Sequence, residues 1–111
     1  MKRSFGWQAR DIHDLQHAFA RAIDAGLHEE VAGRRFMALL PDPRHQDVIE
    51  MSADRRAASA RYHCLMQVEG QGPHQWWQSG VFENTYVKVA DTWELEHLAY
   101  RATSAPVALR C

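Results

Sequence analysis

Two histidines near the start of the chain have a spacing at which side chains can share a metal ion. His13 and His17 are four residues apart, so on a helix they lie on one face within reach of the same ion. Asp14 stands where the glutamate of the H-E-x-x-H zinc motif belongs, and the sequence shows no third ligand. This pair therefore indicates a solvated helix face, and we predict no metal site.

A second pair, Arg61 and His63, lies two residues apart in a stretch that alternates like a strand, so both side chains project from one face. Alternation alone does not determine whether that face is enclosed or exposed to solvent. On an exposed face, the pair would lie across the sheet from Glu83 or Glu96.

The two cysteines carry little chemistry. Cys64 falls inside the same strand pattern, and Cys111 is the last residue. A buried free thiol and a chain end are favoured over a disulfide. Because neither belongs to a Cys-x-x-Cys pair, the sequence argues against a zinc knuckle and a thioredoxin-type redox pair.

The longest regular element is a hairpin over residues 75–103. Aromatic and β-branched residues dominate its first half without a proline, which is typical of a long strand. Residues 91–92 predict a short turn, and residues 93–101 alternate again as the return strand. In this return strand, Trp93 is expected to share a face with Leu95 and His97.

Two helices are predicted ahead of the strands. Residues 7–25 carry an apolar stripe at helical spacing, and Gly26 is the expected stop. A second helix is predicted over residues 28–40, ended by Pro41 and Pro43. The stripe of the first helix consists of Ile12, Leu15, Phe19, Ala22 and Ile23.

Further strands are predicted over residues 47–51 and 57–68. Helices over about 7–40 followed by antiparallel strands over about 47–103 indicate an α+β fold, with helices on one face of a curved sheet. At 111 residues, the chain has room for a single domain, 1–111, with one modest core.

Composition narrows the class of protein. Hydrophobic residues make up 46% and charged residues 24%, which is ordinary for a globular domain. The net charge of −1 and the scattered arginines argue against a nucleic-acid partner. No apolar run approaches the roughly 18 residues that span a membrane, and the N-terminal residues lack a signal-peptide pattern. A cytoplasmic protein without a membrane partner is the expectation.

The amino-acid sequence of the hairpin indicates a family more specifically than its periodicity does. The segments SGVFENTYVK (79–88) and WELEHL (93–98) resemble the C-terminal end of SnoaL-like proteins of the nuclear-transport-factor-2-like superfamily. The family pattern reads roughly G-[VTI]-Y-x-N-x-Y-x-[KR]-x-D-G-x-W-K-[IL]; here Phe82, Thr92 and Glu94 replace its first Tyr, its second Gly and its Lys. ASARY (58–62) and AIDAG (22–26) resemble two further family segments.

This resemblance implies a cone built from a strongly bent sheet and its helices, with a pocket inside. Family members carry another strand and helix between the second helix and the hairpin strands, and residues 36–47 leave no room for them. Either the pocket is open on one side, or the chain is a version of the family fold shortened in the middle. The scytalone dehydratase and dehydrochlorinase branch implies a catalytic pair, Asp24 and His45, in which the histidine moves a proton and the aspartate fixes its tautomer.

The resemblance also implies the pocket wall. By the family pattern, the face that carries Arg61 and His63 looks into the cone. The other implied pocket-lining residues are Phe82, Asn84, Tyr86 and Tyr100. Apolar walls with a few convergent polar groups suit a small hydrophobic molecule with one carbonyl or hydroxyl.

Two functions follow from these expectations. One is a SnoaL-like lyase or isomerase that acts on a small hydrophobic substrate by His–Asp general acid–base chemistry without a cofactor. The other is a non-catalytic ligand-binding or dimerisation module of the same fold, since fold alone does not fix activity. Bulky side chains on both faces of the hairpin also predict a homodimer, because a small cone covers only one face.

Overall fold

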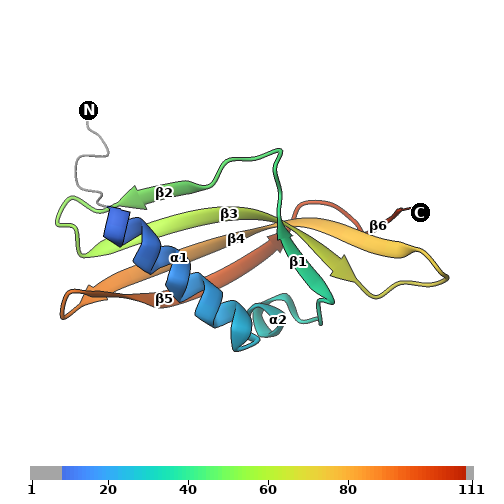
Figure 1. Ribbon diagram of the computed structural model, residues 1–111, viewed down its shortest axis with the longest axis horizontal. Helices are drawn as coiled ribbons and strands as arrows, with labels where there is room; N and C mark the ends of the chain where they lie inside the picture. Colours follow the sequence, from blue (N-terminus) through green and yellow to red (C-terminus); the bar gives the residue numbers. More distant parts are fainter. Residues whose placement is uncertain (1–8, 110–111) are drawn as a thin grey trace.

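The computed structural model describes residues 9–109, and it has two helices followed by one antiparallel sheet (Figure 1). The predicted helix start at residue 7 and Cys111 lie outside the described residues. The elements are α1 (Ala9–Asp24), α2 (Leu27–Ala32), β1 (Ala38–Pro41), β2 (Val48–Met51), β3 (Ala57–Val68), β4 (Gln75–Val89), β5 (Thr92–Ala102) and β6 (Val107–Leu109).

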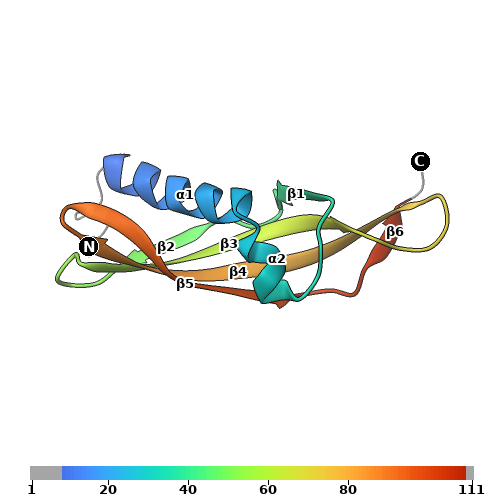
Figure 2. The same ribbon diagram turned by 90° about the horizontal axis from the view of Figure 1, so that it is seen from below.

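The sheet runs in the order β1-β3-β4-β5, with β2 also paired to β3 and β6 to β4. Helix α1 lies across one face of this sheet, which we call the covered face, and α2 lies beside β5; the opposite face is the outer face (Figure 2). The predicted α+β fold is thereby confirmed. None of the helices within residues 9–109 is long and apolar enough to cross a membrane.

Helix α1 packs its apolar stripe on the sheet as its periodicity predicts. Leu15, Ala18 and Ala22 are buried. The helix ends at Asp24, and Gly26 follows in the left-handed region at φ 79°, where its N–H donates to the Ile23 carbonyl. Glycine occupies this conformation at little steric cost, so the predicted stop at Gly26 is confirmed.

The prediction for the second helix is wrong beyond residue 32. Helix α2 ends at Ala32 because Gly33 adopts φ 71° and donates its N–H to the carbonyls of Glu29 and Glu30. Residues 38–41 form β1 instead of a third helical turn, since the edge of β3 supplies a ladder partner for them. Strand β1 was therefore not predicted, and the shortened middle of the chain stays a prediction.

The long strands agree closely with the sequence pattern. Strands β3 and β4 pair along their length, from Ala57 opposite Val87 to Val68 opposite Trp76. A two-residue turn joins β4 to β5, with Ala90 and Asp91 both at positive φ, which is the geometry of a type I′ hairpin. The turn is one residue earlier than predicted, and strand β6 was not predicted.

A β-bulge corrects the predicted faces of β5. Thr85 lies opposite His97, but Tyr86 lies opposite Leu95, so Glu96 is the extra residue. Trp93 and Leu95 therefore lie on the covered face, whereas His97 lies on the outer face and is exposed. The expectation that Trp93 and His97 share a face is wrong, because one inserted residue reverses the alternation.

Candidate functional site: a cavity at the edge of β3

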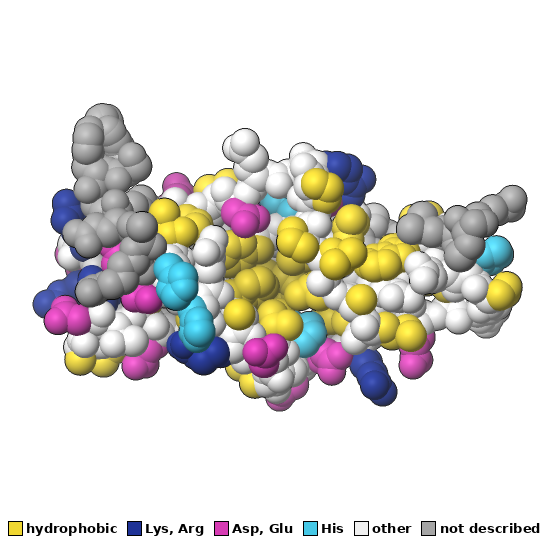
Figure 3. Space-filling model, in the orientation of Figure 1, with side chains coloured by type: hydrophobic (Ala, Val, Ile, Leu, Met, Phe, Trp, Pro, Cys, Tyr) yellow, Lys and Arg dark blue, Asp and Glu magenta, His cyan; other side chains and the backbone are white. Residues whose placement is uncertain are grey.

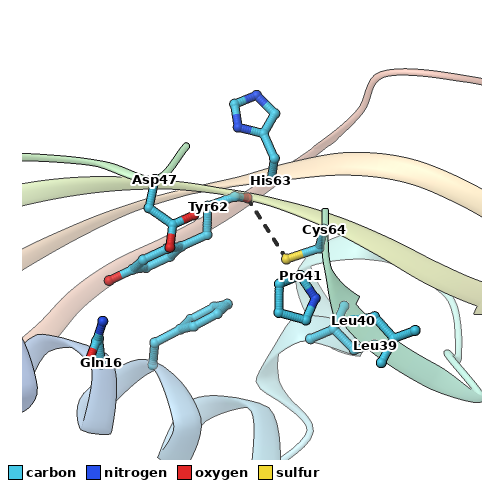
Figure 4. Close-up of a pocket in the computed structure, with 9 residues that line it drawn as sticks. Gln16, Leu39, Leu40, Pro41, Asp47, Tyr62, His63 and Cys64 are labelled. Atoms are coloured by element: carbon cyan, nitrogen blue, oxygen red, sulfur yellow. Dashed lines mark hydrogen bonds between the residues drawn. The ribbon is translucent and has the colours of Figure 1, made fainter. Parts of the chain in front are cut away.

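A cavity of about 210 Å³ lies between α1, β1 and the covered face of β3. Figure 3 shows hydrophobic side chains gathered in a hollow on this side of the molecule, and Figure 4 shows the residues that line it. Most of the lining is apolar, and the polar exceptions come from three different elements. The lining residues are Gln16, Phe19, Leu39, Leu40, Pro41, Asp47, Tyr62, His63 and Cys64.

The cavity opens where the edge of β3 changes partner. Strand β1 pairs with residues 64–67 of β3, and β2 pairs with residues 58–61. Between them, residues 42–47 bridge the edge beside Tyr62 and His63 without forming a strand. The cavity therefore has its polar groups at an interruption of the sheet edge.

Aromatic rings form the wall beneath α1. The Phe19 ring stacks on Tyr62 with centroids 4.7 Å apart and meets Phe82 edge-on at 5.4 Å. Phe19 is half-buried, whereas Tyr62 and Phe82 are buried. A small molecule could extend this cluster without exposing new polar groups.

Asp47 is the carboxylate in this lining. Its side chain points toward the Tyr62 ring, on the side of β3 away from the His63 ring (Figure 4). Partial desolvation at the cavity raises the pKa of the Asp47 carboxyl, although the residue as a whole is exposed, and the nearby His63 opposes this effect. A carboxyl group with a raised pKa beside apolar walls is suited to accept a proton at neutral pH.

The Tyr62 hydroxyl is buried and has no hydrogen-bond partner among the described residues. The Tyr86 hydroxyl lies nearby but outside hydrogen-bonding geometry, and it accepts a hydrogen bond of 3.1 Å from Asn84 Nδ2. Burial raises the pKa of the Tyr62 phenol strongly, with smaller contributions from Tyr86 and Asp47. Tyr62 is therefore a neutral hydroxyl that can donate a hydrogen bond at any physiological pH.

Cys64 also lines the cavity, as the predicted buried free thiol. Burial, with smaller contributions from Asp47 and Asp42, raises the pKa of this thiol to about 12. Because the thiolate is the nucleophilic form, Cys64 is an apolar wall residue rather than a nucleophile.

The structure corrects the predicted face of Arg61 and His63. Residues opposite one another in the ladder share a face, and Arg61 lies opposite Glu83 while Tyr62 lies opposite Phe82. Arg61 is therefore on the outer face, 3.5 Å from the Glu83 carboxylate, as the exposed-face alternative stated. The His63 ring projects to the same side, although the residue borders the cavity.

The other residues implied by the resemblance lie on the covered face, within the core. Phe82, Asn84 and Tyr86 are almost completely buried. Tyr100 is half-buried; its ring contacts Phe82, and its hydroxyl donates to Gln78 Oε1 at 2.9 Å. These side chains support the cavity from behind, and Tyr62 and Cys64 supply the sheet side of its lining.

Asp24 and His45 are both exposed. In residues 9–109, neither a hydrogen bond nor an ion pair joins them; instead, the His45 ring stacks on His63 with centroids 4.2 Å apart. The catalytic pair stays a prediction.

The sequence did not indicate Gln16, Phe19, Asp47 or Tyr62 as site residues. Phe19 was predicted in the apolar stripe of the first helix, but the site role of Asp47 depends on pairing between distant segments. His13 and His17 stack at 6.0 Å on the exposed side of α1. Within the described residues, no cluster of three or more metal-ligating side chains is found.

The chain is a small α+β domain with an apolar cavity between α1, β1 and β3. The family model of the SnoaL-like domain, in the nuclear-transport-factor-2-like superfamily, matches residues 38–99, which is more than half of the chain. The chain belongs to this family. No curated protein sequence matches it.

Proposed function

We propose that this chain binds a small hydrophobic molecule in the cavity and moves a proton on it, as a lyase or an isomerase. Asp47 is the proposed base, and the observation that carries the proposal is its carboxylate in a largely apolar cavity wall. Loss of solvation makes a carboxylate more basic, which favours proton abstraction. The residues around Asp47 indicate which functional group the substrate carries.

Tyr62 is the proposed hydrogen-bond donor to an oxygen of the ligand. Proton removal from a carbon next to a carbonyl places negative charge on the carbonyl oxygen, and a neutral phenol stabilises that charge. The Tyr62 hydroxyl is buried without a hydrogen-bond partner among the described residues, so a ligand oxygen would supply the missing acceptor. An isomerase would return the proton to another carbon, and a lyase would instead expel a leaving group.

Exchange of deuterium into cyclohexanone tests the proposal without a known substrate. The wild-type chain in D₂O should accelerate exchange at the carbons beside the carbonyl, measured by proton NMR. Asp47→Asn should lower the rate by a factor on the order of 10² or more. Glu94→Gln, which removes an exposed carboxylate on the outer face, should leave the rate unchanged.

Saturation-transfer NMR with cyclohexanone separates binding from chemistry. Binding without accelerated exchange would favour the second function, a non-catalytic ligand-binding module. Equal exchange by wild type and Asp47→Asn would exclude Asp47 as the base. If cyclohexanone neither binds nor undergoes accelerated exchange, the proposed site is contradicted.

A further inference from the structure

Residues 42–47 wrap around the exposed edge of β3, and we call them the clasp. The clasp begins with the Asp42 N–H, which donates to the His63 carbonyl at 3.0 Å and so continues the ladder for one more bond. From there it contacts the outer face through Arg44 and His45. It then returns toward the covered face, where the Asp47 side chain points at Tyr62 (Figure 4).

An ion pair fixes the first part of the clasp. The Asp42 side chain is 2% exposed, and its carboxylate accepts hydrogen bonds from the Arg44 backbone N–H, Nε and one terminal nitrogen, at 2.8 to 3.0 Å. These contacts hold the pKa of the Asp42 carboxyl at about 2. Removing the guanidinium would leave an enclosed charge without its partner, which is strongly unfavourable.

Arg44 also ties the clasp to the next strand. Its terminal nitrogen donates to Ser79 Oγ on β4 at 3.0 Å, so the side chain reaches across β3 on the outer face. The His45 ring lies on the His63 ring at 4.2 Å and an interplanar angle of 18°, which adds a second outer-face contact. Two side chains on the outer face thus hold a segment whose last residue faces the cavity.

Within the clasp, the Arg44 guanidinium pairs with Asp42 and not with Asp47, and this affects the basicity of Asp47. Arg44 is engaged by Asp42, and within residues 9–109 no ion pair joins Asp47 to a lysine or arginine. The Asp47 carboxylate therefore meets apolar wall and partial desolvation instead of a neutralising guanidinium. A carboxylate paired with arginine would be a much weaker base.

We propose that the clasp positions the Asp47 carboxylate in the cavity wall, with Arg44 as the positioning residue that holds the clasp closed. This inference rests on the proposed function for its catalytic meaning, but the position of Asp47 is measurable without any substrate. A clasp that opened would carry Asp47 away from Tyr62 into solvent and widen the cavity mouth at residues 62–63 of β3.

The test is a carbon-detected NMR titration of the Asp47 carboxyl in the wild-type chain, Arg44→Gln and Arg44→Lys. If the clasp positions Asp47, its pKa should fall in both variants toward the ordinary value of about 3.9. Arg44→Lys keeps the charge but loses the bidentate fork, and it provides a folded variant if Arg44→Gln unfolds. Arg35→Gln, at an exposed position on the loop after α2, is the matched control and should leave the Asp47 titration unchanged.

Two outcomes would overturn the inference. One is an unchanged Asp47 titration in a folded Arg44 variant, even if its melting temperature falls, because that would make Arg44 a structural contact only. The other is an equal shift in Arg35→Gln. If the Arg44 variants shift the Asp47 titration while Asp47→Asn leaves cyclohexanone exchange intact, the clasp stands and the proposed function fails.

Discussion

Trp93 is the single side chain whose truncation should cost the most stability. It is 1% exposed at the start of β5, and its Nε1–H donates to Asp11 Oδ1 on α1 at 3.1 Å. The Lys88 ammonium lies 5.6 Å from the ring centroid and 3.8 Å from the same carboxylate oxygen. Trp93 therefore joins the hairpin to the first helix by packing and by a hydrogen bond to a charged acceptor.

The cost of losing it follows from these contacts. Trp93→Ala removes a buried indole, worth about 3–5 kcal/mol, and also a charge-assisted hydrogen bond, worth about 1.5–3 kcal/mol. These terms overlap, so we expect a loss of about 4–6 kcal/mol in the free energy of unfolding. A domain of this size has only about 5–15 kcal/mol in total. The Trp93→Ala variant should therefore have a free energy of unfolding near zero. It should be less stable than a variant with any single substitution at a charged residue.

Trp93→Phe makes the prediction measurable, because it keeps an aromatic ring and removes the donor. Urea denaturation followed by far-ultraviolet circular dichroism should show a loss of about 2–3 kcal/mol. Trp77→Phe is the control: Trp77 is half-buried, and its Nε1 is 3.4 Å from the exposed Gln75 side chain. If Trp93→Phe shifts the midpoint no more than Trp77→Phe does, the hydrogen bond to Asp11 does not stabilise the fold as argued.

Three further predictions concern charge and assembly. Because the pKa of Asp42 is lowered from 3.8 to about 2, its ionised carboxylate stabilises the fold fully above pH 3.8, and this stabilisation is lost as the pH falls through about 2. Asp42→Asn should therefore lower the free energy of unfolding by about 1–2 kcal/mol at pH 6 and by less at pH 2. If Asp24 and His45 form the predicted pair, Asp24→Asn should move the NMR titration of His45 to lower pH, and superimposed curves would end that prediction. Sedimentation at micromolar concentration should show a homodimer formed through the outer face, and a monomer alone would contradict it.

The strands could be predicted from the sequence because their signals are local. Residues 57–68 and 75–89 alternate without interruption, and the two-residue turn at 90–91 fixes the register of the hairpin. The face of β3 was also predictable, since its even-numbered residues are the apolar set and its odd-numbered residues include Arg61 and His63. The family pattern suggested the opposite face, and the composition of the two faces was the better guide.

Two features could not be predicted locally. Residues 38–41 are compatible with a helix or a strand, and the free edge of β3 decides between them; only Gly33 signalled that α2 had already ended. The bulge at Glu96 has no proline or glycine to mark it, yet it determines that Trp93 faces the core. Both depend on pairing between segments that lie far apart in the sequence.

The candidate site forms at the gap between β1 and β2 along the edge of β3, and this gap could not be predicted from the sequence. Pro41 is the last residue of β1, and Pro43 lacks the N–H that would continue the ladder, so the chain leaves the edge of β3 and resumes pairing only at Val48. A single uninterrupted edge strand would pair residues 62–63 and leave no bridging segment beside the cavity. The detour leaves that edge open and gives Asp47 a position outside the ladder, from which its carboxylate can turn toward Tyr62. Beyond the bond from the Asp42 N–H to the His63 carbonyl, no ladder holds the backbone of the clasp, so sequence changes there should alter the cavity mouth more than changes within β1 or β2.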